Sequence, residues 1–309
     1  MSDIPCCMST LTNGMRLPLA GVDDEEGARL PDDLPPVIDA HVHVFPDAIF
    51  RAVWRWFDNY GWPIRYKLYA DDVVTHLKSR GVRDVVLLHY AHKPGIARFM
   101  NDFVADVAQR HAVTGLATVA PDDVDVAAIL EEGFAKGLKG VKLHTHVQAV
   151  AADDARLFPV YELCQQRGLP VVIHAGREPK SDALPVDTYA ICDAGRVARV
   201  LTMFPRLKLC VPHLGADEFA EYAALVAKHD NLWLDTTMML GEFFQGSALQ
   251  GDAMTWVRAR PDRVMYGTDF PNSPYAWDRE VRHIARAGLR DADLELLLAG
   301  NARALFGIP

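Results

Sequence analysis

The sequence has no long apolar run and no cluster of basic residues, and each absence argues against a class of protein. No hydrophobic stretch approaches the roughly 20 residues that a membrane-spanning helix needs, so we expect no membrane span. Lys and Arg total 32 against 41 Asp and Glu, which gives a formal net charge of −9. Such an acidic chain is not expected to have nucleic acid or an anionic membrane as its main partner.

Cysteines are few and irregularly placed. The five are Cys6, Cys7, Cys164, Cys192 and Cys210, and no two of them form a CxxC pair. An odd number without regular spacing argues against a disulfide framework and favours a reducing compartment. The first residues also lack the basic start and apolar stretch of a secretory signal. Together these features predict a soluble, cytoplasmic protein.

Eight apolar runs alternate with amphipathic stretches of helical length. Near-continuous hydrophobicity is typical of parallel strands that are covered on both faces. The runs span residues 37–45, 84–90, 113–120, 139–146, 170–176, 207–215, 231–237 and 263–270. Eight strand–helix units in series predict an α/β fold of the (β/α)₈ (TIM) barrel type. The rival, a doubly wound open sheet, would not need eight units, and the first run is followed by no glycine-rich dinucleotide loop.

The expected domain organisation is one barrel preceded by a tail. Residues 1–35 mix acids, Gly and Pro and are expected to be irregular, whereas residues 36–309 form the barrel. The 309 residues suggest two domains by length alone, but α/β barrels of roughly 250 residues fold as one unit. One of the predicted helices carries apolar residues at helical spacing from Phe99 to Val107. This apolar stripe is expected to face inward.

An aromatic-rich insertion follows the first predicted strand. Residues 45–69 contain three of the six tryptophans, Trp54, Trp56 and Trp62. On a barrel this segment rises from the face where active sites form. It is expected to be helical, and two interpretations stay open: a lid or pocket wall, or a small subdomain that packs on the barrel or on a second subunit. The second would accommodate a homodimer.

Histidines gather at the ends of the predicted strands. His41 and His43 stand two apart on the first strand, and side chains so spaced point the same way. His174 on the fifth strand can add a third nitrogen and Asp269 on the eighth an oxygen. Buried ionisable groups are costly unless they are paired or metal-bound. This set predicts one bound divalent ion, foremost Zn²⁺, although Mn²⁺, Fe²⁺ and Co²⁺ accept the same ligands.

The strand-end motifs IDAHVHVF, GVKLHTH, VVIHAG, VPHLG and YGTDFP, with the closing GNARALFGI, occur in an order that resembles the amidohydrolase superfamily. More narrowly, residues 36–308 resemble the amidohydrolase-related branch that includes aminocarboxymuconate semialdehyde decarboxylase and related decarboxylases, hydratases and lactone hydrolases. The resemblance implies that His41, His43, His174 and Asp269 bind one catalytic metal. It also implies that His213 acts beside the metal as an acid, a base or an electrostatic stabiliser.

The fourth predicted strand carries positions whose roles the resemblance leaves open. In some relatives a carboxylated lysine on this strand bridges two metals, whereas the branch with a KLH motif is usually mononuclear. Lys142 can then pair with a carboxylate or contact substrate. His144 and His146 are in phase with Lys142 and can face the substrate. His146 departs from the KLHP form common in the branch, and a surface-loop histidine is the alternative.

The chemistry that follows is hydrolysis of a small amide, ester or lactone by metal-activated water. Asp269 would take the proton and His213 would polarise the carbonyl. The alternative is non-hydrolytic, metal-dependent decarboxylation of a small unsaturated or aromatic acid. Arg177, Arg51 and Arg55 are candidates for holding a substrate carboxylate. A barrel that binds ligand without catalysis and a structural metal site are less well supported, since no ligand position is missing and no cysteine cluster is present.

Overall fold

The computed structural model describes residues 21–177, 183, 184, 186–241 and 249–309. Residues 21–35 contain no helix or strand, and the rest of the predicted tail, with Cys6 and Cys7, lies outside the described residues. The backbone of this segment is tied to the barrel, because Leu30 N–H donates to the Arg80 carbonyl and Gly21 N–H to the Pro274 carbonyl. None of the helices in the described ranges is long and apolar enough to cross a membrane.

Parallel strands form the centre of the molecule. Within the described residues they are β1 (Ile38–His43), β2 (Asp84–Leu88), β3 (Thr114–Gly115), β4 (Val141–His144), β5 (Pro170–His174), β6 (Lys208–Val211), β7 (Leu232–Asp235) and β8 (Val264–Met265). Regular pairing runs in the order β1-β2-β3 and β4-β5-β6-β7-β8. Each strand therefore neighbours the next one along the chain.

Irregular hydrogen bonds close the two remaining seams. Between β3 and β4, Ala117 N–H donates to the Gly140 carbonyl at 2.8 Å and Lys142 N–H to the Ala117 carbonyl at 2.7 Å. Between β8 and β1, Ala40 N–H donates to the Tyr266 carbonyl and His43 N–H to the Phe270 carbonyl. The eight strands thus close on themselves, which confirms the predicted (β/α)₈ barrel.

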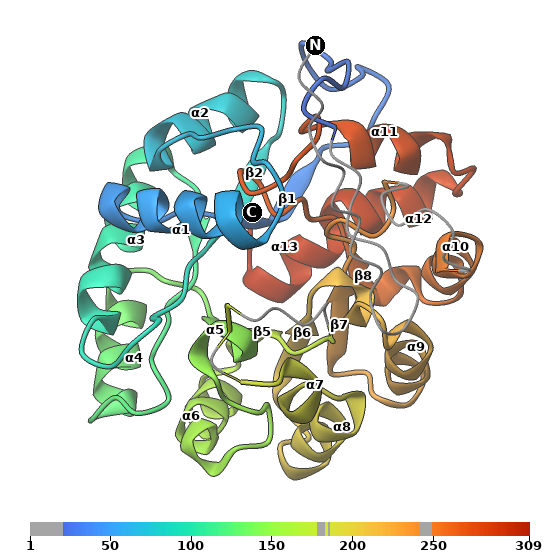
Figure 1. The fold of residues 1–309 in the computed structure, drawn as a ribbon. Helices are drawn as coiled ribbons and strands as arrows, with labels where there is room; N and C mark the ends of the chain where they lie inside the picture. Colours follow the sequence, from blue (N-terminus) through green and yellow to red (C-terminus); the bar gives the residue numbers. More distant parts are fainter. Residues whose placement is uncertain (1–20, 178–182, 185, 242–248) are drawn as a thin grey trace.

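Helices surround the strands, as Figure 1 shows. They are α1 (Asp47–Tyr60), α2 (Ala70–Ser79), α3 (Ala97–His111), α4 (Val126–Ala135), α5 (Thr145–Gln148), α6 (Phe158–Arg167), α7 (Thr188–Ile191), α8 (Ala194–Met203), α9 (Phe219–Lys228), α10 (Leu249–Ala259), α11 (Arg279–Arg286), α12 (Asp291–Glu295) and α13 (Asn301–Phe306). Short turns are the 3₁₀ segments η1 (Ala155–Leu157), η2 (His213–Gly215) and η3 (Pro261–Arg263) and the π-helical η4 (Leu296–Gly300).

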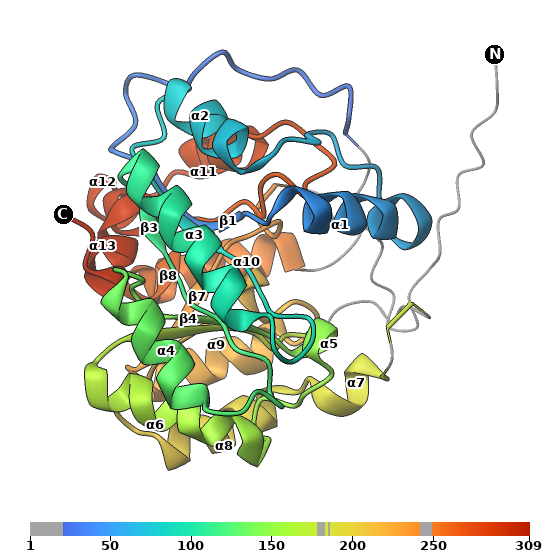
Figure 2. The same cartoon turned by 90° about the vertical axis from the view of Figure 1, so that its left-hand side faces the viewer.

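The core has two parts. The barrel interior holds the inward-facing side chains of the strands, among them Ile38, Val86, Val172 and Cys210, together with residues of the C-terminal helix α13 such as Phe306. A larger cluster fills the layer between strands and outer helices. Figure 2 shows α13 at the opposite end of the barrel from α1, α5 and α7. The C-terminal helix therefore plugs one end and leaves the other for the loops that follow the strands.

Several expected boundaries differ from the structure. Regular pairing in β3 and β8 covers two residues each. Beyond these residues the backbone still forms hydrogen bonds to neighbouring strands, but at uneven spacing. The predicted strand ends at 146 and 215 are wrong, since the chain turns into α5 after His144 and into η2 at His213. Phe99 was expected inside but is 60% exposed, because it falls at the solvent edge of the α3 stripe.

Candidate metal centre

Three side chains converge where β1 meets β8. His41 and His43 extend from the buried strand β1, and Asp269 stands four residues after the end of β8. The His41 Nε2 atom lies 3.2 Å from His43 Nε2, and Asp269 Oδ1 lies 3.4 Å from the first and 3.0 Å from the second. The potential ligand atoms all lie within 4.8 Å of one another. This is the compact N,N,O set that divalent transition metals accept.

The hydrogen bond on the far side of His41 fixes its tautomer. His41 Nδ1 lies 2.9 Å from Asp235 Oδ2. Burial, reinforced by the charge of Lys142, lowers the pKa of His41 to about 4, so the ring is neutral at physiological pH. A neutral ring that donates from Nδ1 presents a lone pair at Nε2.

The donor set fits a cation. The Nε2 lone pair of His41 faces Asp269 Oδ1, and two acceptors so close repel each other unless a positive charge or a shared proton lies between them. Burial by itself raises the pKa of Asp269, but His43 and His41 lower it to about 2, so the carboxylate is ionised. A divalent metal ion would satisfy all three groups at once.

The backbone around the trio is tightly constrained. Asp269 has a left-handed φ of 65°, and its N–H donates to the His41 carbonyl at 3.0 Å. Gly267 lies directly against His41, since an added Cβ would come within 2.8 Å of the His41 Cβ. Asp39 accepts from His41 N–H at 3.1 Å and from the Thr268 hydroxyl at 2.5 Å. The two ligand-bearing segments are thus tied together behind the ligand atoms.

His213 stands beside the trio on a strained turn. It opens η2 with a φ of 57°, and its N–H donates to Asp235 Oδ1 at 3.1 Å. Its Nδ1 lies 3.0 Å from the Thr237 carbonyl, so Nδ1 carries a proton and Nε2 is turned to the other side. The His213 ring centroid is 5.6 Å from that of His41 and 4.6 Å from that of His174.

His174 and His144 form a second group of rings next to His213. The two rings stack with centroids 4.1 Å apart and an interplanar angle of 7°. His174 is not one of the three residues whose ligand atoms converge, and its ring neighbours that of His213, which in turn neighbours that of His41. The predicted fourth ligand thus adjoins the ring of His213, and its role as a ligand stays a prediction.

Lys142 is fully buried inside the barrel on β4. Its charge contributes to lowering the pKa of His41, and it acts against the burial that raises the pKa of Cys210. The lysine thus lies within electrostatic reach of both residues. As a fully buried side chain, it can influence the histidines through its charge.

His146 departs from the sequence-based expectation. It lies on α5 rather than on β4, so the two-residue phase shared by Lys142 and His144 does not extend to it. The surface-loop alternative is also wrong, because His146 is buried and its Nε2 lies 3.2 Å from the Gly176 carbonyl. Its ring centroid is 5.0 Å from that of His174. The turn after His144 brings it back against the histidine stack.

Arg177 is held at the rim by several groups. Its Nε donates to the Cys192 carbonyl at 2.9 Å, it lies 3.7 Å from Glu218 Oε1, and its guanidinium stands 5.5 Å from the centre of the Tyr189 ring. By contrast, Arg51 and Arg55 lie on the exposed face of α1, where Arg51 donates to the Tyr69 hydroxyl. Of the three candidate arginines, Arg177 is the one that follows a site strand.

The insertion 45–69 packs its aromatic side chains against the site. Phe45 stacks on His43 with ring centroids 5.8 Å apart and lies edge-on to Phe50. After α1, Trp62 donates from its indole N–H to the Asn272 carbonyl at 2.7 Å and packs on Met238 and Tyr275. The segment therefore covers the loop that carries Asp269.

Two residues of this region were not singled out from the sequence. Tyr90 follows β2, and its ring lies edge-on to His43, Phe45 and His144. Its position in DVVLLHY, at the end of an apolar run, was the signal available. Asp235 likewise ends the run NLWLD, but nothing in that pattern shows that it contacts His41.

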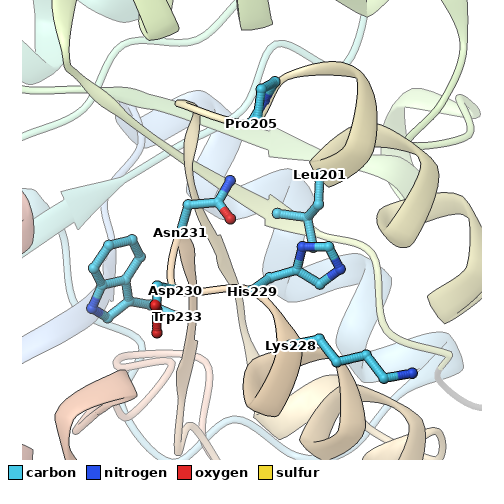
Figure 3. A pocket seen from close by; sticks show the side chains of 7 residues that line it. All are labelled: Leu201, Pro205, Lys228, His229, Asp230, Asn231 and Trp233. Carbon is cyan, nitrogen blue, oxygen red and sulfur yellow. The ribbon is translucent and has the colours of Figure 1, made fainter.

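A surface hollow of about 430 Å³ lies elsewhere, as Figure 3 shows. Its lining comes from the end of α8, the segment between α9 and β7, and β7 itself: Leu201, Pro205, Lys228, His229, Asp230, Asn231 and Trp233. These residues stand at the starts of the strands, whereas the histidines stand at the ends. The hollow is therefore separate from the metal centre.

The amidohydrolase family model matches residues 38–308, nearly nine-tenths of the sequence. The chain belongs to the amidohydrolase family. It is therefore an enzyme of the amidohydrolase superfamily, whose members are metal-dependent, as the strand-end motifs indicated. The matched residues include the whole barrel and every residue of the candidate centre.

Curated relatives match parts of this amidohydrolase. A dihydroorotase of Novosphingobium aromaticivorans is 26% identical over 191 residues, which cover 60% of this chain and 50% of the relative. A 2-amino-3-carboxymuconate-6-semialdehyde decarboxylase of Dictyostelium discoideum is 27% identical over 150 residues, 42% of each protein. The chain thus matches about half the length of these curated relatives.

Solved structures share the fold over most of the chain. A 5-carboxyvanillate decarboxylase from N. aromaticivorans, complexed with manganese, has a TM-score of 0.65 at 16% identity. The match covers 92% of this chain and 99% of the decarboxylase chain. A proposed 2-pyrone-4,6-dicarboxylic acid hydrolase from Pseudomonas putida has a TM-score of 0.60 at 21% identity, covering 88% and 97%. At these identities the likeness supports the barrel alone.

Proposed function

We propose that this amidohydrolase is a hydrolase that uses one divalent metal ion to cleave an amide, ester or lactone bond in a small organic substrate. The observation that carries the proposal is the convergence of His41 Nε2, His43 Nε2 and Asp269 Oδ1 within 4.8 Å, with His213 beside them. Three protein ligands leave a coordination position for water or substrate, which is typical of a catalytic metal site rather than a structural one.

His41, His43 and Asp269 would hold the ion, and His174 is the proposed further ligand. Imidazole and carboxylate together suit Zn²⁺, which is our first choice, and equally accommodate Mn²⁺, Fe²⁺ or Co²⁺. A bound ion of this kind polarises a substrate carbonyl and lowers the pKa of water towards about 7.

Asp269 and His213 are proposed to take different roles in proton transfer and charge stabilisation. Asp269 is an ionised carboxylate at the reacting centre and is the proposed general base, which accepts the proton of the attacking water. His213 Nδ1 lies beside the Thr237 carbonyl, so Nε2 is the nitrogen proposed to stabilise the developing oxyanion when the ring is protonated, or to transfer a proton to the leaving group.

Substrate binding is proposed for the side of the site away from β1. His144 stacks on His174 and meets Tyr90, so it can contact a substrate that lies over the rings. Arg177 is proposed to bind a substrate carboxylate at the rim. Lys142 is proposed to act on His41 electrostatically, through its charge, from inside the barrel. The insertion 45–69 is proposed to cover the site and exclude water. We also propose that the enzyme acts on a small-molecule substrate, lies in the cytoplasm and forms a homodimer.

Decarboxylation is the second candidate. It is favoured by one of the two curated relatives, a carboxymuconate semialdehyde decarboxylase, and by a fold neighbour that is a carboxyvanillate decarboxylase. The same metal centre can stabilise the carbanion-like charge left when a carboxyl group departs. Hydrolysis is placed first because Asp269 and His213 lie within electrostatic reach of each other and are proposed to act as base and acid on one water.

The deciding experiment incubates the metal-loaded enzyme in H₂¹⁸O with lactones, amides, esters and unsaturated or aromatic carboxylic acids. Hydrolysis places one ¹⁸O in the product and releases no CO₂, whereas decarboxylation releases one CO₂ per turnover. Asp71→Asn is the control variant and should react like the wild type, because Asp71 is an exposed carboxylate paired with Arg110 and His111. CO₂ release from an acid, with no ¹⁸O-labelled product from any ester, lactone or amide, would overturn the hydrolase assignment.

A further inference from the structure

One buried carboxylate contacts both the metal centre and the neighbouring catalytic candidate. Asp235, at the end of β7, is 1% exposed. Its Oδ2 lies 2.9 Å from His41 Nδ1, and its Oδ1 accepts from the backbone N–H of His213 at 3.1 Å. The two oxygens therefore serve two different strand ends, β1 and β6, from a position between them.

The contact with His41 determines which ring nitrogen carries the proton. An ionised carboxylate only accepts hydrogen bonds, so His41 Nδ1 must donate. The Nε2 lone pair then faces His43 and Asp269, which is the tautomer that can ligate a metal. Without this partner, the imidazole would be free to carry its proton on Nε2, where it blocks ligation.

The contact with His213 holds a backbone conformation. His213 and Leu214 have φ values of 57° and 51°, a left-handed region that is unfavourable for residues with a side chain. The hydrogen bond from His213 N–H to Asp235 helps to retain this turn, which in turn aims the imidazole at the site. Asp235 itself is fixed, because it pairs with Met265 in the β7–β8 ladder and Thr236 N–H donates to the Met265 carbonyl.

We propose that Asp235 is a positioning residue that sets the metal-binding tautomer of His41 and the placement of His213 through one carboxylate. This inference rests on the proposed function for its catalytic consequence, but the hydrogen bonds on which it depends exist without metal or substrate. Metal affinity and the orientation of His213 are therefore coupled through the end of β7.

The variant Asp235→Asn tests the idea with little change in volume. An amide has one accepting oxygen and one donating nitrogen, whereas both partners of Asp235 now donate. The backbone N–H of His213 cannot change its role, but His41 can change tautomer. The amide oxygen should therefore stay on His213 and the amide nitrogen should face His41, which moves the His41 proton to Nε2.

Two measurements test the expected change in metal affinity and in the His41 tautomer. Competition with a chelating dye should show Zn²⁺ affinity reduced about 10- to 100-fold, the range found when a partner of a metal-ligating histidine is removed. In the metal-free protein, ¹⁵N NMR of histidine side chains, with His41 assigned by its loss in His41→Gln, should show the proton on Nδ1 in the wild type and on Nε2 in the variant. Circular dichroism checks the fold of each.

Asp278→Asn is the control, because Asp278 is also a buried carboxylate but accepts from the Gly27 N–H and pairs with Arg282 rather than with His41. It should leave the His41 tautomer and Zn²⁺ affinity within about threefold of wild type. Unchanged affinity in Asp235→Asn, or a wild-type His41 that carries its proton on Nε2, overturns the proposal. The wild-type NMR measurement stands even if the variant does not fold, and a wild type that binds no metal would instead refute the proposed function.

Discussion

Gly267 lies against His41, and this contact predicts how the metal centre responds to a single methyl group. A Cβ at position 267 would lie 2.5 Å from Thr237 Oγ1 and 2.8 Å from the His41 Cβ. Real Cβ atoms do not approach neighbours so closely, so Gly267→Ala must displace something. No left-handed φ is involved at this position, and the effect is therefore one of packing alone.

The neighbours of Gly267 have little freedom to move away. The His41 ring is held at Nδ1 by Asp235, and the His41 backbone is held by Asp39 and by the Asp269 N–H. The displacement should therefore shift the chain after β8, which carries Asp269 two residues later. Overpacking of this kind costs about 1–3 kcal/mol of stability. A shift of about 0.5 Å is enough to spoil a ligand geometry, so we expect Zn²⁺ affinity to fall at least about tenfold.

Urea unfolding of the metal-free protein and dye competition for Zn²⁺ measure the two effects separately. Gly137→Ala is the control, because Gly137 has a φ of 96° and no heavy atom within 4 Å of an added Cβ. It should cost a similar amount, about 1–3 kcal/mol, through backbone strain, with wild-type metal affinity. If Gly267→Ala folds and binds Zn²⁺ as tightly as the wild type, the close approach of β8 to β1 does not position the ligands, and the reasoning fails.

Three further predictions address the base, the ion and a buried carboxyl. Asp269→Asn should abolish turnover and leave the circular dichroism spectrum unchanged; measurable turnover would remove Asp269 from proton transfer. Chelation should lower the unfolding free energy by about 2.7 kcal/mol where free metal had stood at about 100 times its Kd, and an unchanged thermal melt would contradict metal binding. Burial raises the pKa of Glu218 to about 7 from 4.5, so the unfolded chain releases this proton first and stability falls as pH rises through that window. Glu218→Gln should reduce this fall between pH 5 and 8 in urea unfolding; an identical slope would refute it.

The fold could be predicted because hydrophobicity repeats on the scale of whole strand–helix units. Eight apolar runs separated by helical stretches leave few alternatives to a closed barrel. Strand limits were harder, since the runs continue for several residues after regular pairing stops. His213 shows why: it follows β6 in an apolar context, yet its left-handed backbone leaves the ladder.

The centre could be predicted in part for a related reason. His41 and His43 share a face through the two-residue period of a strand, and barrel closure brings Asp269 beside them. His146 could not be placed by the same rule, because β4 ends at His144 and a helix begins. Asp235 and Tyr90 become significant only through contacts between strands that are far apart in sequence, and periodicity carries no information on such contacts.

Three residues with a left-handed backbone lie where these contacts are made, whereas others, such as Ala112 and Asp125, stand at the ends of outer helices. Asp269, His213 and Met238 adopt φ values of 65°, 57° and 64°, and all three follow barrel strands at the end that carries the site. Such conformations persist only where surrounding bonds over-determine them. For His213 and Asp269 those bonds are identifiable, since their N–H groups donate to Asp235 and to the His41 carbonyl. Because both acceptors are also joined to the His41 side chain or backbone, the position of this one histidine and the strained turns on either side depend on each other. A substitution of Asp235 should therefore disturb the metal ligand His41 and the acid–base residue His213 together.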